Sequence, residues 1–559
     1  MSKFVFGQVP VLKKKRTRFN LNQPIKTTMS VGDLCPIYCQ EIYPGDSFKV
    51  KTAFFSRLSV PFRKVPIDNL FMDVAFYFVP NRLTYEHWAE LMGENKTSKW
   101  TQPTAYSTPT VTVPANVGGK TVASYFGIPN GCAEGIDINA LPFRAFALIY
   151  NYWWRDENNI DPTLVNLGST DGTLNNNAWS ASNYLGLVPK AARLHDYFST
   201  CLPGTQKGTA ASIPLTGTAP VKTSASDLFV NGSAALHMRK TSGTFANDES
   251  LGVASVVSGT SNKAANIGSA ANGGSFPTNS IVYPSNLYAD LSAGSGGATI
   301  NDLRLNIQIQ KLYELDARAG TRYKESVLSH FGVGNNDGVL QEPQFLGGRR
   351  VPLNIQGIAQ TSSDTYNVQD DDFTNLLGQF SGTSISSGFS GYSKSFTEHG
   401  FVIGVAVIRY LHTYQQGIER FWSRTGRLSY YDPLFSHLGE QAVYKKELDA
   451  THTGYDDVFG YQEAFADLRY RPALITGNLN MTRNTKQFAQ LWHFGDFYVS
   501  SPILGPTFIN ENADNVLRTI GITEDASNNY ETPFIVDFYH KVKAIRVLPS
   551  YGVPGLMDH

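Results

Sequence analysis

Segments with the residue pattern of β-strands lie near both ends of the chain, and this arrangement limits the fold more than any other feature. From Phe48 to Val60, apolar or small side chains alternate with polar ones such as Lys49, Lys51 and Arg57, which is typical of a strand with one buried face. The segment Leu70–Val79 is almost entirely apolar, so we expect a strand that is covered on both faces.

Two further segments rich in β-branched and aromatic residues, 401–414 and 534–548, lie in the C-terminal part of the chain. Pro533 and Pro549 bracket the second of them. Strand partners this far apart in sequence are typical of Greek-key topologies. We therefore expect a mainly β protein, a two-sheet antiparallel β-sandwich of the jelly-roll type with long insertions between its strands and a few helices.

Two helices interrupt the β pattern. One is expected over roughly 141–154, and the other follows Thr299, a candidate N-cap, and stops at Gly320. The apolar stripe of the second helix consists of Leu305, Ile309 and Leu312.

Composition divides the chain into four parts. Between Gly204 and Gly297 the sequence is rich in Gly, Ser, Ala, Thr and Asn, and residues 251–300 contain only two charges, Lys263 and Asp290. Disordered tails usually carry high net charge, so we expect this insertion to be an ordered, uncharged projection. The expected parts are a basic arm at 1–30, the first part of the sandwich at 31–203, the insertion at 204–298 and the remainder at 299–559 with a helix near 300–319.

The charge balance argues against a protein drawn as a whole onto nucleic acid. Lys plus Arg equals Asp plus Glu at 47 each, so any contact with DNA must be local. Charged residues are only 17% of the chain while aromatic residues reach 12%, which indicates buried interfaces or uncharged loops at the surface. No apolar run is long enough to span a bilayer, and the first residues lack the pattern of a cleaved signal, so we expect neither membrane insertion nor export.

Motifs for cofactors and metals are weak. Gly118–Thr121 has a glycine-glycine-lysine-threonine sequence, but Pro114 stands where a phosphate-binding loop needs a glycine and an amide donor. Cys35 and Cys39 lack a second pair of ligands at zinc spacing, and the acidic run 370–372 lacks the spacing of a calcium loop. We therefore expect neither a cofactor nor a metal.

Candidate catalytic groups also have simpler explanations. His399, His412 and His540 lie in or beside strand-like segments, where a histidine is more often a hydrogen-bonded structural group. Asp156 and Glu157 are adjacent, so they point in different directions and favour a charge cluster at a helix end over an acid and base pair. The sequence thus predicts no enzyme.

The N-terminal run is the strongest candidate for nucleic-acid binding. Five cations lie within six residues, namely Lys13, Lys14, Lys15, Arg16 and Arg18. They could neutralise about five phosphates without reading base sequence, in a contact that weakens steeply with salt. The alternative is a solvated tail with no ligand.

Four segments resemble the major capsid protein of microviruses (Microviridae), in particular the gokushovirus branch of these single-stranded DNA phages. They are VPIDNLFMDVAFYFVPNRLTYEHWAELMGEN at 65–95, NALPFRAFALIYNYWWRDEN at 139–158, AGTRYKESVLSHFGV at 319–333 and LPSYGVPGLMDH at 548–559. These stretches are long, carry unusual residues in fixed order and sample both ends and the middle of the chain. The insertion and most loops show no matching signature.

The resemblance implies an eight-stranded jelly roll, sixty copies in a T=1 shell, a circular single-stranded DNA inside and an insertion that projects at threefold axes. Its implied partners are identical copies, the genome, scaffolding protein and a host surface receptor. Because the chain has no net charge, we also expect a separate small basic DNA-binding protein. The expected location is the virion, with the host cytoplasm during assembly.

Two other function classes share the predicted architecture. A lectin-like carbohydrate-binding β-protein would also be rich in aromatic residues, and β-sandwiches host glycosidases as well. No carboxylate pair in the sequence identifies a hydrolase.

Overall fold

The computed structural model describes residues 15–94, 106–132, 135–208, 221–223, 237–240, 249–256, 265–269, 282–284, 287–289, 300–319, 328–329, 341–359, 380–435, 438–482, 487–520 and 532–551. The chain divides into two compact units. The first consists of Met1–Lys207 with Glu314–His559, and the second of Gly208–Tyr313.

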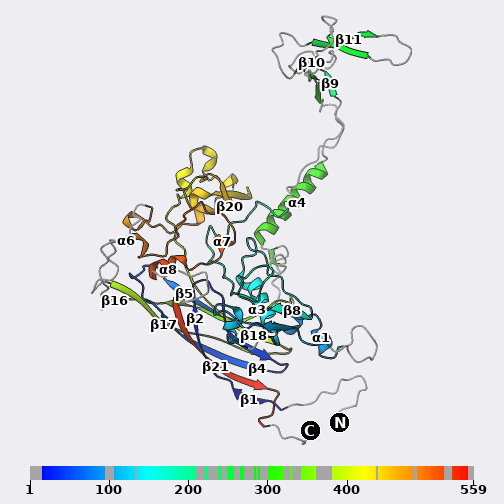
Figure 1. The fold of residues 1–559 in the computed structure, drawn as a ribbon. Helices are drawn as coiled ribbons and strands as arrows, with labels where there is room; N and C mark the ends of the chain where they lie inside the picture. The colour runs from blue at the N-terminus through cyan, green and yellow to red at the C-terminus, as the bar shows by residue number, and fades with distance from the viewer. Residues whose placement is uncertain are drawn as a thin grey trace. The chain divides into compact units, whose positions relative to one another are not determined.

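The first unit contains two large antiparallel sheets. In the first sheet, the C-terminal strand lies between strands from the N-terminal part of the chain, as Figure 1 shows for β21 and β4. Its main strands, in spatial order, are β2 (Gln23–Met29), β21 (Phe534–Arg546), β4 (Ser47–Leu58) and β17 (Phe380–Ser395). Two short strands extend it, β1 (Thr17–Asn20) on β21 and β16 (Ile355–Ala359) on β17.

The second sheet has four strands. In spatial order these are β3 (Cys35–Ile42), β18 (Gly400–Tyr410), β5 (Leu70–Pro80) and β15 (Gln344–Leu353). If the eight main strands are counted along the chain, the first sheet has the order first, eighth, third, sixth, and the second sheet has the order second, seventh, fourth, fifth. This interleaving of early and late strands is the double Greek key of a jelly roll, and the predicted mainly β sandwich is confirmed.

The core between the sheets follows from the alternation in the sequence. In β4 every second residue is buried, among them Phe48 and Phe54, while the residues between them are exposed. In β21 the same period buries Phe534 and Phe538. The strand predicted from Phe48 to Val60 is therefore confirmed as β4, although β4 ends at Leu58.

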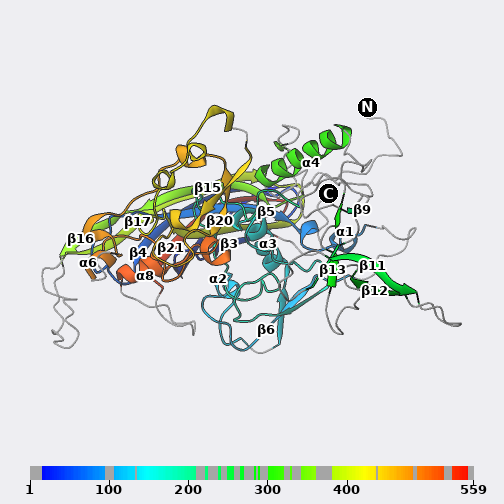
Figure 2. The same cartoon turned by 90° about the horizontal axis from the view of Figure 1, so that it is seen from above.

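The second sheet is covered on its other face as well. Helix α3 (Leu141–Ile149), which continues into a π-helical turn at Tyr150–Trp154, packs its Phe143 and Phe146 with residues of β5 and β18 such as Tyr77. Figure 2 shows α3 close to β5. This second core explains why β5 is apolar on both sides, as the sequence predicted.

Shorter elements fill the long connections of the first unit. They are η1 (Asn81–Leu83), α1 (Trp88–Leu91), β6 (Thr110–Val113), α2 (Val122–Tyr125), β7 (Ile136–Asn139), β8 (Thr170–Thr173), η4 (Arg420–Ser423), η5 (Arg427–Ser429), η6 (Pro433–Phe435), β19 (Glu440–Tyr444), η7 (Lys445–Glu447), β20 (Val458–Glu463), η8 (Ala466–Arg469), η9 (Gly477–Leu479), α6 (Gln487–Gln490), α7 (Pro506–Ile509) and α8 (Asp514–Ile520). A third apolar cluster, with Phe198, Tyr414 and Phe459 among its members, lies among these connections.

The second unit contains short antiparallel strands. They are β9 (Val221–Thr223), β10 (His237–Lys240), β11 (Glu249–Val256), β12 (Ala265–Ser269), β13 (Val282–Pro284) and β14 (Leu287–Ala289). Helix α4 (Ile300–Ala319) spans the boundary of the two units and confirms the helix expected near 300–319. The candidate cap Thr299 and the stop Gly320 lie outside the described residues. No helix in the described ranges is both long enough and apolar enough to cross a membrane.

Part of the segment 1–30, expected as an arm without a core of its own, belongs to the first sheet. From Thr17 the chain forms β1 and then β2, and both pair with β21. These strands lie beside β21 with mostly exposed side chains, so they lack the strong apolar alternation of β4. Backbone pairing to β21 therefore orders a stretch whose polar sequence indicated a free tail.

Candidate functional site

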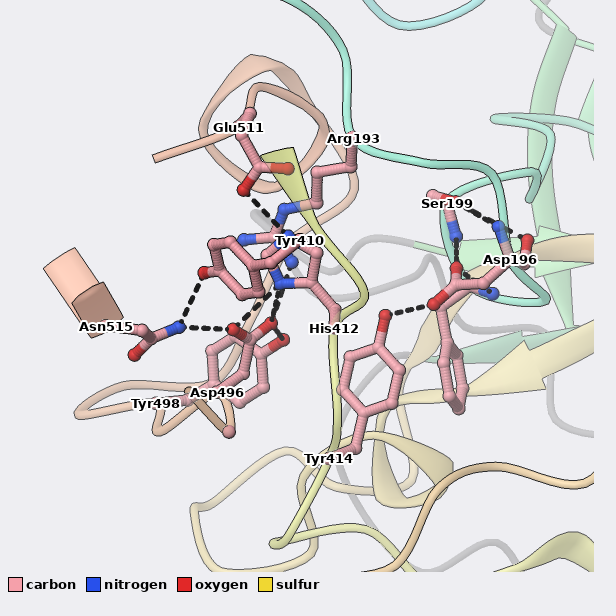
Figure 3. Close-up of polar contacts among 12 residues, drawn as sticks. Arg193, Asp196, Ser199, Tyr410, His412, Tyr414, Asp496, Tyr498, Glu511 and Asn515 are labelled. Carbon is pink, nitrogen blue, oxygen red and sulfur yellow. Dashed lines mark hydrogen bonds and ion pairs between the residues drawn. The ribbon is translucent and has the colours of Figure 1, made fainter. Parts of the chain in front are cut away.

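A buried group of charged side chains lies where four irregular segments meet next to the end of β18 (Figure 3). His412 donates from Nδ1 to Asp496 Oδ1 at 3.0 Å and from Nε2 to Glu511 Oε1 at 2.9 Å, and its side chain is 2% exposed. Burial alone would lower the pKa of this histidine, but the two carboxylates raise it to about 9. His412 is therefore an imidazolium cation at neutral pH.

Asp496 is the centre of this network. It accepts hydrogen bonds from Arg193 Nη1 at 2.7 Å, from Tyr498 Oη at 3.0 Å and from Asn515 Nδ2 at 2.6 Å, besides the bond from His412. Burial would raise the pKa of Asp496, but the charges of Arg193 and His412 hold it well below its usual range. The carboxylate is thus ionised and fully engaged.

A second carboxylate ties a neighbouring loop to the same region. Asp196 accepts a hydrogen bond from the Tyr414 hydroxyl and from the backbone amides of Phe198 and Ser199, at 3.1 and 2.7 Å. Tyr414 follows His412 by two residues, so the two carboxylates hold neighbouring positions of one segment (Figure 3). The network thus joins long connections that have little regular structure of their own.

The network has the contacts of a structural site. Both imidazole nitrogens of His412 donate to carboxylates, so neither is free to accept a proton or to bind a metal. His540 is likewise buried, with Nδ1 2.8 Å from Thr52 Oγ1 and Nε2 2.9 Å from the Ile37 carbonyl, and burial lowers its pKa to about 4. His399 lies against the rings of Tyr43 and Trp88.

The other residues that the sequence singled out also make structural contacts. Asp156 accepts bonds from the backbone amides of Asn158 and Asn159, which form a turn after the helix. Thr121 caps α2 by accepting from the Ser124 amide at 3.2 Å, and the Gly118 amide donates to the Asn176 side chain at 2.6 Å. The segment 118–121 therefore leads into a short helix, and the amides of Gly118 and Thr121 are hydrogen-bonded within the chain.

The two cysteines considered as metal ligands both lie on β3. Cys35 is fully buried, and burial raises the pKa of its thiol well above the ordinary value. Across the described ranges, no group of three or more His, Cys, Asp or Glu side chains is placed to hold a metal.

The basic run lies at the start of the described chain. Lys15, Arg16 and Arg18 are exposed, and Lys13 and Lys14 lie outside the described residues. Arg18 belongs to β1 and is paired in register with Ile545 of β21. Part of the run is therefore fixed at an edge of the first sheet.

One segment of the first unit exposes many large apolar side chains. Between residues 418 and 438, which include three short 3-10 helices, the exposed side chains are those of Ile418, Phe421, Trp422, Leu428, Tyr430, Tyr431, Leu434 and Leu438. Trp422 is 71% exposed and Leu434 is 86% exposed. We call residues 418–438 the aromatic segment. Exposed apolar groups of this size, where they form a continuous patch, are typical of sites of protein–protein contact.

Comparison with known proteins identifies the family of this chain. The sequence profile of one family, described as capsid protein (F protein), matches residues 7–556. The chain belongs to this capsid protein family. Its predicted kinship with the major capsid proteins of microviruses is thereby confirmed.

Relatives of this capsid protein cover nearly its whole length. It is 37% identical to capsid protein VP1 of Bdellovibrio phage phiMH2K over 98% of this chain and 97% of the relative. It is 37% identical to capsid protein VP1 of Spiroplasma virus 4 over 96% and 95% of the two chains. Capsid protein VP1 of Chlamydia phage 1 is 32% identical over 99% of this chain and 97% of its own.

Sequence reasoning missed the buried network of this capsid protein. Its charged members are far apart in sequence and form no motif: Arg193 and Asp496, for example, are separated by 303 residues. The sequence contains one hint of the network, namely charged residues that lie close to aromatic residues such as Tyr410 and Tyr498, but this pattern alone does not identify the partners.

The raised pKa of His412 predicts a pH dependence of stability. A histidine whose pKa is about 9 when folded and 6.5 when unfolded stabilises the fold fully below pH 6.5, and this contribution is lost as the pH rises through 9. Between pH 6 and pH 9.5 we expect the wild type to lose about 3 kcal/mol more of its free energy of unfolding than His412→Gln does. Urea denaturation of unassembled protein at several pH values measures this difference, and parallel pH profiles would contradict it.

Proposed function

We propose that this capsid protein assembles as sixty copies into a T=1 icosahedral shell that encloses a circular single-stranded DNA genome. The observation that carries the proposal is the aromatic segment, because a member of a capsid protein family leaves these side chains uncovered as a single chain. Identical copies would cover them through contacts whose rotations close into a shell instead of continuing as a fibre. Its place is the virion, after assembly in the host cytoplasm, and its role involves no catalysis.

The chemistry of the aromatic segment matches that of interface cores. Such cores favour Tyr, Trp, Phe, Met and Arg and contain few other charges. Helix α4 exposes further large apolar side chains, those of Leu303, Leu305, Ile307, Leu312 and Leu315, of which Leu305 is 59% exposed. Leu305 and Leu312 belong to the apolar stripe that the sequence predicted for this helix, and their exposure favours a contact with other chains over a contact inside one chain.

The lectin-like and glycosidase alternatives gain no support from the cleft beside the aromatic segment. This cleft of about 250 Å³ has aromatic walls, but the rings of Tyr197 and Tyr470 stack on each other at 5.3 Å and leave less ring surface for a sugar. Its carboxylates Glu447 and Asp467 are ion-paired with Arg420 and Arg424. The pairing favours a structural role over acid and base catalysis.

Replacing exposed apolar side chains of the aromatic segment with charged ones tests whether this segment is an assembly contact. Trp422→Glu combined with Leu434→Glu should abolish particles, because two charges would be buried without partners at each contact. Both side chains are exposed in the single chain, so the far-ultraviolet circular dichroism of the soluble protein should not change. Electron microscopy of the expressed protein counts the particles.

The matched control is Trp422→Phe with Leu434→Met, which keeps the apolar surface and should keep assembly. If the double glutamate variant forms normal particles, this segment is not the assembly contact, and the proposal loses the observation on which it rests.

We further propose that the insertion 204–298 contributes to host attachment, because it has few charges and forms much of the second unit. Deleting residues 210–290 should leave particle formation intact and abolish adsorption of particles to host cells. Sedimentation of cells with labelled particles measures adsorption. Adsorption equal to that of the wild type would contradict this role.

We also propose that the N-terminal basic run contacts the genome, with a small basic protein and a scaffolding protein as further partners. Alanine at Lys13, Lys14, Lys15, Arg16 and Arg18 should reduce the DNA packaged per particle, because about five phosphate contacts would be lost. The ratio of absorbance at 260 and 280 nm of purified particles measures this content. Wild-type content would refute the contact.

A further inference from the structure

The exposed face of the first sheet carries four lysines in two directly opposed pairs. Lys49 and Lys51 lie on β4, and Lys541 and Lys543 lie on β21, which runs beside it (Figure 1). The register pairs Lys541 with Lys51 and Lys543 with Lys49. All four side chains are exposed, and none of them forms an ion pair with another described residue.

This arrangement is unfavourable for the isolated protein. Side chains directly opposite each other on neighbouring strands lie about 5 Å apart at Cβ, and like charges at such positions destabilise a sheet. Exposed lysines on a sheet face usually need no explanation beyond solvation, and spacing them apart would serve that purpose. Two opposed pairs side by side indicate that something of negative charge compensates them.

Aromatic rings lie in the adjacent row of the same face. Ala53 of β4 is paired in register with Tyr539 on one side and with Phe389 of β17 on the other. Tyr539 is 46% exposed and Phe389 is 65% exposed. The guanidinium of Arg349 lies 4.3 Å from the centre of the Phe389 ring.

This face has an open depression of about 700 Å³. It is lined by three of the lysines, Lys49, Lys51 and Lys541, and by the rings of Tyr539 and Phe389. Gly391, which is opposite Lys51, places no side chain on the lysine row. A row of cations beside a row of exposed rings matches the two chemical parts of an unpaired nucleotide, the phosphate and the face of the base.

Charges around the depression are mostly positive. Arg57 lies on the same face of β4, and Arg18 of β1 is in register with Ile545, two residues beyond Lys543. Asp537 is the acidic residue of this face of β21, and it is paired with Lys26 and Phe55. The described end of the N-terminal basic run therefore joins the same positive surface.

We propose that this face, formed by Lys49, Lys51, Lys541, Lys543, Tyr539 and Phe389, binds single-stranded DNA. The lysines contact phosphates and the two rings stack on bases. The inference deepens the proposed function and rests on it, because a genome must lie against the shell for this face to meet it. Duplex DNA fits less well, since its bases are already stacked and offer no free faces to the rings.

Binding of full-length unassembled protein to fluorescein-labelled dT30, followed by anisotropy from 50 to 300 mM NaCl, tests the lysines. For single-stranded DNA, the slope of log K against log salt becomes shallower by about 0.7 for each phosphate contact removed. The variant that combines Lys49→Ala, Lys51→Ala, Lys541→Ala and Lys543→Ala should therefore have a slope shallower by about 3. The matched control removes four exposed cations elsewhere, by Arg304→Ala, Lys311→Ala, Arg427→Ala and Arg471→Ala, and should keep the wild-type slope. A wild-type slope in the first variant, or an equal loss in the control, would overturn the proposal.

The rings are tested separately. Tyr539→Ala with Phe389→Ala should weaken binding of dT30 by at least about fivefold at constant salt, while Tyr539→Phe should bind like the wild type because its ring remains. Binding of a 30-base-pair duplex should be the same for all three proteins. A ring variant that binds dT30 normally would contradict stacking.

A variant with arginine at the four lysine positions is the control for folding. It keeps the positive charges, so its salt slope should equal that of the wild type. A shallower salt slope in this arginine variant would contradict the proposal that the positive charges of these four residues carry the binding. The alanine variant should melt no lower than the wild type, because it loses a repulsion. If vesicles with anionic lipid bind the wild type through these lysines and dT30 does not, the face recognises a lipid surface and the proposal fails.

Failure of this inference can be distinguished from failure of the proposed function. If particles form normally but neither set of substitutions affects binding of dT30, the protein is a shell subunit whose DNA contacts lie elsewhere. If the wild type forms no particles, the proposed function fails whatever the binding result. Electron microscopy of the same preparations separates the two outcomes.

Discussion

The fold depends on the insertion of the last strand between two of the first strands. β21 pairs on one side with β2 and on the other with β4, so residues more than four hundred positions apart close the first sheet. The register points Phe534, Val536 and Phe538 into the space between the sheets, against the second sheet. Without this strand, β2 and β4 would lose their shared neighbour, and the core side chains that pack against β21 would face water. The strand order of the sandwich thus requires both ends of the chain.

Closing the sandwich in this way leaves very long connections, and these carry the surface of the protein. A buried ionic network fixes several of them, because Asp496 binds Arg193 of a loop before the second unit and Asn515 of helix α8. A charge buried in such a network is costly to separate from its partners, which holds the loops in one arrangement. The aromatic segment follows the strand that leads into this network, so a rigid base supports the side chains that we assign to contacts between copies.

The sequence predicted those parts of the fold whose pattern is local. The alternation in β4, the apolar stretch of β5 and both longer helices were found because burial leaves a regular period in the residues. β2 and β15 were not found, since β2 is polar and β15 contains Gly347, Gly348 and two arginines. Register lies beyond a single sequence, so Lys49 and Lys51 could be placed on one face but not opposite Lys543 and Lys541. The sequence predicted hydrogen-bonded histidines, and His412 and His540 are hydrogen-bonded, but their partners are distant in sequence and could be identified only from the structure.

We propose that identical copies cover the exposed apolar surface of this chain and so form a closed container. The mass of the purified assembly tests it most directly, because a container of sixty copies of a 61.5 kDa chain has one expected value, about 3.7 MDa before any DNA is added. Native mass spectrometry of the wild-type protein should give one narrow population at that mass. A protein that remained at 61.5 kDa under every assembly condition, or that formed a broad series of open oligomers, would rule out a closed shell of identical copies.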